Sequence, residues 1–171
     1  LLARYLGEKK FDYANNTMMH GILLGFLNGL VFLVLGLLFS NVFLSWFTRD
    51  VQILGLANTY IRICTMFSFS VFVQIIFERI MQATGNAIYN MVMQGAGAII
   101  NIILDPILIF GWFGLPKMGV TGAAIATVIG QFCGMMIGYW ITKKKIDALE
   151  IKVSNFSFST DILSRIYKVG V

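Results

Sequence analysis

The fold of this chain is decided by the stretch AIYNMVMQGAGAIINIILDPILIFGWF, residues 87–113. Its length and apolar composition predict a membrane-crossing helix, because a bilayer core of about 30 Å needs about 20 residues of helix. Within it stands Asp105, the only acidic residue between Ile80 and Lys143. A carboxylate at the centre of a membrane helix costs roughly 2.5 to 3.5 kcal/mol. Asp105 is therefore predicted to be a functional residue that handles an ion or a proton.

The composition extends this prediction to the rest of the chain. Of its 171 residues, 58% are hydrophobic and 12% are charged, against about 25% charged in ordinary soluble domains. A soluble domain of this length could not bury so much apolar surface, so lipid is the expected solvent. The net charge of +5 would suit nucleic acid only if the basic residues formed a stripe on a soluble face. They cluster beside apolar segments instead, so we expect contact with membrane lipid and no nucleic-acid partner.

Four hydrophobic segments predict an all-α fold, a polytopic membrane helical bundle. The predicted spans are residues 18–44, 57–82, 87–113 and 119–142. The breaks between them are too short to hold domains, and Gly and Pro mark their turns. Residues 1–145 are therefore predicted to form one membrane domain. Residues 146–171 are predicted to form a cytoplasmic linker, in which an amphipathic helix begins near Asp161 and lies on the membrane surface.

The distribution of Lys and Arg predicts the orientation of the bundle. Four spans place ten of these cations on one side, namely Arg4, Lys9, Lys10, Arg79, Lys143, Lys144, Lys145, Lys152, Arg165 and Lys168. The other side holds three, namely Arg49, Arg62 and Lys117. The positive-inside rule makes the first side cytoplasmic. We therefore expect a multi-pass protein of the cell (inner) membrane with both ends of this chain in the cytoplasm, and His20 at the membrane interface.

A polar stripe is predicted along the helix of residues 87–113. Successive members lie three or four positions apart, which places them on one helical face; they are Asn90, Gln94, Gly97, Asn101 and Asp105. Polar side chains in a membrane helix face a partner helix or a wet cavity. For Asn90 and Gln94 two interpretations stay open, hydrogen bonds between helices or the lining of a cavity together with Gly97.

Pro106 is predicted to make a backbone carbonyl on this face available as an oxygen ligand. It has no N–H, so it is predicted to kink the helix and to free the carbonyl of Ile102. A free carbonyl beside a carboxylate and the Asn101 amide forms a set of oxygen ligands, which hard cations such as Na+ prefer. Alternatively Asp105 binds a proton, because burial favours the neutral carboxylic acid. The sequence does not decide whether Asp105 binds Na+ or H+. It has no Cys or His pattern that predicts another metal.

The last span carries a predicted packing surface. Small residues recur there every four positions, a pattern that lets helix backbones approach closely; they are Gly122, Ala126, Gly130, Gly134 and Gly138. A weaker series in the first span consists of Gly21, Gly25 and Gly29. Both series are predicted to face neighbouring helices.

Several runs of this sequence resemble the multidrug and toxic compound extrusion (MATE) family. They are NIILDP at residues 101–106, GVTGAAIAT at 119–127, RYLGEKK at 4–10, and Arg79 followed by Gly85 and Asn86. The resemblance implies twelve transmembrane helices in two lobes, with helices three to six of the first lobe and the start of the inter-lobe linker in this chain. It also implies a cation site to which Asn101, Asp105 and Thr127 correspond. An acidic partner on the first helix and the second lobe would lie outside this chain.

The predicted function is secondary active efflux of organic, often cationic, small molecules in exchange for Na+ or H+, by alternating access. No cofactor is expected beyond the coupling ion. An enzyme is not expected, because the spans contain no HExxH, no GxSxG and no paired catalytic carboxylates. One alternative is a lipid-linked oligosaccharide flippase of related architecture, which would need several cations within the spans, where Arg62 is the only candidate. The other is a structural membrane subunit, in which Asp105 would have no role.

Overall fold

The computed structural model describes residues 1–145 and 158–170, and within these ranges the chain is helical with no strand. The helices are α1 (Leu2–Gly7), α2 (Phe11–Ser45), α3 (Val51–Met66), α4 (Ser68–Ala83), α5 (Ala87–Phe110), the 3-10 helix η1 (Trp112–Gly114), α6 (Val120–Lys145) and α7 (Thr160–Gly170). By length and composition, α2, α5 and α6 can each cross a membrane, and α3 with α4 makes a fourth span if the bent pair is counted as one. The predicted all-α membrane bundle is confirmed.

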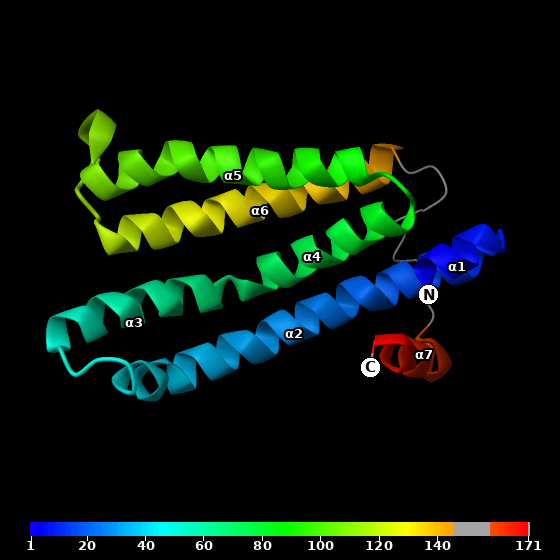
Figure 1. The fold of residues 1–171 in the computed structure, drawn as a ribbon, viewed down its shortest axis with the longest axis horizontal. Coiled ribbons are helices and arrows are strands. Elements are labelled where there is room, and N and C mark those ends of the chain that lie inside the picture. The colour runs from blue at the N-terminus through cyan, green and yellow to red at the C-terminus, as the bar shows by residue number, and fades with distance from the viewer. Residues whose placement is uncertain (146–157, 171) are drawn as a thin grey trace.

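The helices lie in a layered order that Figure 1 shows from the side. The pair α3 and α4 lies between α2 and α6, and α5 packs on the other side of α6. The start of α2, the α4–α5 connection and the end of α6 come together at one end of the bundle (Figure 1). The amphipathic helix predicted near Asp161 is present as α7, which packs against α2. Residues 146–157 of the predicted linker lie outside the described residues.

The predicted span 57–82 differs from the structure, where it corresponds to α3 and α4, bent by 53°. The helix starts earlier than predicted because Asp50 caps it, its Oδ1 accepting from the backbone N–H of Gln52 at 2.8 Å. The bend follows from a serine at the break. Ser68 Oγ donates to the carbonyls of Thr65 and Gly29, both at 2.8 Å, and such side-chain bonds to the backbone bend helices.

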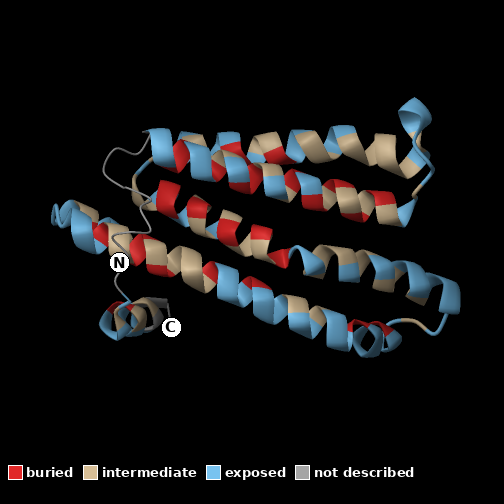
Figure 2. Cartoon of the chain, turned by 180° about the vertical axis from the view of Figure 1, so that it is seen from behind, coloured by how far each residue is buried: buried red, intermediate tan, exposed pale blue. Residues whose placement is uncertain are grey.

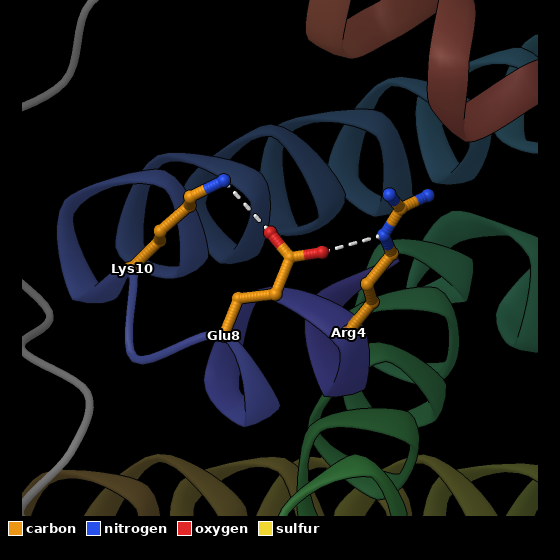
Figure 3. Close-up of polar contacts among 3 residues, drawn as sticks. All are labelled: Arg4, Glu8 and Lys10. Atoms are coloured by element: carbon orange, nitrogen blue, oxygen red, sulfur yellow. Dashed lines mark hydrogen bonds and ion pairs between the residues drawn. The ribbon is translucent and has the colours of Figure 1, made fainter.

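Two ion pairs within the RYLGEKK run link the residues of the turn between α1 and α2 (Figure 3). Glu8 accepts from Arg4 Nε and from Lys10 Nζ, each at 2.8 Å. The pKa of Glu8 is lowered to about 2, because Lys10 and then Arg4 donate hydrogen bonds to its carboxylate. Glu8 therefore stays ionised at neutral pH, and both ion pairs persist until the pH falls towards that value.

Most of the buried residues of α2 and α4 lie towards the end of the bundle that holds the α4–α5 connection, whereas α6 has buried residues along its length (Figure 2). The core there is built from α1, α2, α4, α5 and α6, and includes Ala14, Phe77, Met81, Met93 and Ile141. Towards the opposite end, α2, α3 and the connection between them expose large apolar side chains such as Leu38, Phe47 and Val51. Lipid would cover such a surface in a membrane, where apolar side chains need no burial in protein.

The small residues of α6 pack as predicted, because they lie directly against neighbouring helices. A Cβ added to Gly130 would lie 2.8 Å from the carbonyl oxygen of Gly97 on α5, and one added to Gly97 would lie 2.9 Å from that of Gly130. Gly122 meets the backbone of Leu108 in the same way, at 2.6 Å. Along α2, a Cβ at Gly29 would overlap the Cα of Phe69 on α4. Both predicted glycine series are therefore confirmed as packing surfaces.

Replacing Gly97 by Ala should lower the free energy of unfolding by about 1 to 3 kcal/mol, because the new methyl group forces the α5 and α6 backbones apart. Thermal unfolding of the purified protein in detergent measures this loss. Gly95→Ala is the matched control, since a Cβ at Gly95 has no heavy atom within 4 Å and Ala favours a helix by about 1 kcal/mol. Equal melting temperatures for the two variants would contradict the close packing.

Candidate functional site

The polar stripe of α5 opens into a cavity of about 250 Å³ between α4, α5 and α6. Three of the predicted stripe residues line it, namely Gln94, Gly97 and Asn101. Asn90 does not line it, and its Oδ1 accepts from Gln94 Nε2 at 3.3 Å within the same helix. The cavity therefore lies beside the middle of the stripe, with Asp105 one helical turn beyond Asn101.

Asn101 joins the cavity to the carboxylate. In one orientation of its amide, Nδ2 donates to Asp105 Oδ2 at 3.3 Å and Oδ1 accepts from the backbone N–H of Thr127 at 3.1 Å. In the opposite orientation, Nδ2 donates to Thr127 Oγ1 at 3.4 Å. The first orientation satisfies the carboxylate as well as the amide, and we adopt it on that ground. The structure thus brings together all three residues of the predicted cation site.

The two carboxylate oxygens of Asp105 differ in their hydrogen bonding, because the Asn101 amide donates only to Oδ2. Asp105 Oδ1 is buried and has no hydrogen-bond partner among the described residues. A buried acceptor without a donor costs about 1 to 3 kcal/mol, and more when it is charged. A cation or a proton at Oδ1 would remove this cost.

Pro106 lies within α5, which continues to Phe110 and ends at Gly111. The φ of Gly111 is 73°, a left-handed conformation that suits glycine.

Two amides that the sequence analysis did not single out complete the cavity. Gln74 of α4 and Gln131 of α6 line it opposite the α5 stripe. The Gln74 amide fits against Gly134, where a Cβ would lie 2.9 Å from Nε2. Gly134 was predicted as a packing residue, and the space it leaves is filled by this polar side chain. The cavity is therefore lined by amide groups of α4, α5 and α6 and by the Thr127 hydroxyl, without a charged side chain.

Comparison with known proteins finds relatives along nearly the whole chain. A family model described as MatE matches residues 1–107. The Multidrug export protein MepA of Staphylococcus aureus is 26% identical over 170 residues, which are 99% of this chain and 37% of MepA. The chain thus spans about 37% of the length of this curated relative.

Solved structures show the same helix arrangement. One is described as the inward-facing conformation of a multidrug resistance MATE family transporter of the MOP superfamily; it has a TM-score of 0.87 and 27% identity over 99% of this chain and 38% of that one. The outward-facing conformation of such a transporter gives a TM-score of 0.85 and 27% identity over 99% of this chain and 37% of that one. The arrangement of α1 to α7 therefore fits both conformations about equally well.

Asn101 and Asp105 should be energetically coupled, because the amide donates to the carboxylate. A double-mutant cycle of Asn101→Ala and Asp105→Ala, measured by denaturant unfolding, should give a coupling free energy of about 0.5 to 3 kcal/mol. Asn90→Ala is the control, since Asn90 lies about 22 Å from Asp105 along the helix and its effect should add to that of Asp105→Ala. Additive effects for Asn101 and Asp105 would contradict the geometry described for the site.

Proposed function

This chain belongs to the MatE family, and on that premise we propose that the protein is a secondary active transporter that expels organic compounds in exchange for Na+ or H+. One observation carries the proposal. Asp105 keeps a buried oxygen without a partner among the described residues, while Asn101 connects its other oxygen to the polar cavity. A membrane carboxylate of this kind is expected to bind a coupling ion.

The Asn101 amide can couple the cation site at Asp105 to the polar cavity, because it contacts Asp105 and lines the cavity. Without a cation, its Nδ2 donates to Asp105 Oδ2. When Na+ or a proton binds on the Oδ2 side of the Asp105 carboxyl group, an oxygen is the better neighbour there, and the amide turns so that its Oδ1 faces the carboxyl group. Nδ2 then donates to Thr127 Oγ1, in the orientation with the 3.4 Å separation. The turn changes the donor and acceptor pattern at the cavity wall, so cation and substrate bind with different free energies.

The cavity chemistry favours organic substrates over a lipid-linked pyrophosphate. Its lining is neutral and rich in amides, whereas a pyrophosphate would need several cations. Arg62, the predicted candidate for such a cation, is exposed on α3 and is not among the lining residues, which include no Lys or Arg. The name of MepA, a multidrug export protein, supports the same choice of substrate class.

We also propose the orientation of this bundle in the membrane and the presence of further elements that complete the transporter. The end of the bundle with Arg4, Lys10, Arg79 and Lys143 is proposed to face the cytoplasm, since cations favour that side. An acidic residue on a first helix is proposed to complete the cation site. A second lobe is proposed to close the substrate path, with alternating access by rocking of the two lobes.

Asp105→Asn in the full-length protein should lower dye efflux from cells by about fivefold or more, because the amide has neither the negative charge that attracts Na+ nor a site for a proton, and typical coupling free energies correspond to that range. Fluorescence of a cationic dye in loaded cells measures the rate. Asp12→Asn is the matched control, because Asp12 is exposed in the first turn of α2. Unchanged efflux by Asp105→Asn would remove the coupling role.

Removing the Na+ gradient at fixed pH separates the two candidate ions. If Na+ occupies Asp105, efflux should stop, because no ion then drives the exchange; if H+ does, efflux should continue and stop when the proton gradient is collapsed. The same dye assay measures both conditions. Efflux that survives the loss of both gradients would contradict secondary active transport.

A further inference from the structure

His20 on α2 is completely buried, at 0% exposure, and holds the segment that leads into α7. The backbone N–H of Ser159 donates to His20 Nε2 at 3.1 Å. The other ring nitrogen, Nδ1, lies 2.8 Å from the carbonyl oxygen of Asn16. Because Nε2 accepts a hydrogen bond, the proton of the neutral ring is on Nδ1, which donates to Asn16. The docked position of α7 therefore requires one protonation state of this ring.

Further contacts tie the same segment to α2 and α1. The ring of Phe158 lies 5.8 Å from the His20 ring, centroid to centroid. Ile162, in the first turn of α7, is 4% exposed. It lines a cavity of about 440 Å³ together with Tyr5 of α1 and Asn16 of α2. The start of α7 is thus seated beside His20, on the opposite side of α2 from its contact with α4 (Figure 1).

We propose that His20 and Ser159 form a pH-sensitive latch, in which α7 is docked on α2 while His20 Nε2 is unprotonated and is released when Nε2 is protonated. Protonation turns Nε2 from an acceptor into a donor, so two N–H groups would face each other at the position of the present hydrogen bond. It also places a charge on a fully buried ring, which is unfavourable. The docked state is therefore favoured at high pH and is lost as the pH falls.

The charges around His20 do not offset this effect. The titratable side chains on the elements packed at this end of α2 are Arg4, Tyr5, Glu8 and Lys9 of α1 and its turn, Lys10, Asp12 and Tyr13 at the start of α2, Glu78 and Arg79 of α4, and Asp161, Arg165 and Lys168 of α7. Glu8 already binds Arg4 and Lys10 at 2.8 Å, and Asp161 binds Arg165 at 3.0 Å. A charged His20 ring would have to compete with these cations for Glu8 or Asp161. Of the other two carboxylates, Asp12 is exposed about two helical turns before His20, and Glu78 accepts from Gln82 Nε2 at 3.1 Å.

The position of α7 can be measured by double electron–electron resonance in the full-length protein. Nitroxide labels are placed at Ser164 of α7 and Ala87 of α5, both exposed, after Cys64 and Cys133 are replaced by Ala. At about pH 8 we expect one narrow distance distribution, and at about pH 5 a second, broader population that grows as the pH falls. An identical distribution at both pH values would overturn the latch. This readout is a distance, so its outcome is independent of whether the protein transports drugs.

Two variants separate His20 from other titrating groups. His20→Gln supplies an amide oxygen as acceptor for Ser159 and carries no titratable proton, so α7 should stay docked at both pH values. Ser159→Pro removes the donor without changing the buried ring, so the broad population should be present at both pH values. An acid-induced shift that persists in His20→Gln would assign the effect to another group and overturn the proposal.

Discussion

The contact of the α5 and α6 backbones at Gly97 and Gly130 is the constraint on which the rest of this structure depends. Each residue lies so close to the carbonyl oxygen of the other that a Cβ at either one would come within 2.9 Å. This approach lets the short Asn101 side chain reach the α6 backbone at Thr127 while it also contacts Asp105. Helices held apart by one more methyl group would break that 3.1 Å bond. The packing surface and the proposed cation site are thus two consequences of the same glycine pair.

Features that depend on local spacing could be predicted from the sequence, and features that depend on a distant partner could not. The four-residue period of glycines in α6 and the polar stripe of α5 follow from helical geometry. The predicted family is confirmed by the MatE match, which covers the run at 101–106. Gln74 and Gln131 were missed because a single amide in an apolar helix has no periodic signal. The burial of His20 could not be predicted, since its partner Ser159 is 139 residues away.

The helices of this chain are proposed to move as one unit in the transport cycle. The core lies at the end that holds the α4–α5 connection, and the bend between α3 and α4 separates it from a half that exposes apolar side chains. The arrangement fits an inward-facing and an outward-facing MATE transporter with TM-scores of 0.87 and 0.85. In the transport proposed here, these helices move largely as one unit, and the change on cation binding is confined to groups such as the Asn101 amide. Such a small change at one site can bias a two-state movement of whole lobes.

The central claim is that Asp105 couples a cation gradient to substrate movement, and it is tested most directly in proteoliposomes that contain the full-length protein. Two modes are measured side by side in the wild type and in Asp105→Asn: uphill accumulation of a labelled substrate driven by an imposed Na+ or H+ gradient, and downhill exchange of labelled for unlabelled substrate without a gradient. The account predicts that Asp105→Asn loses gradient-driven accumulation and keeps downhill exchange. Gradient-driven accumulation that persists in Asp105→Asn would contradict it.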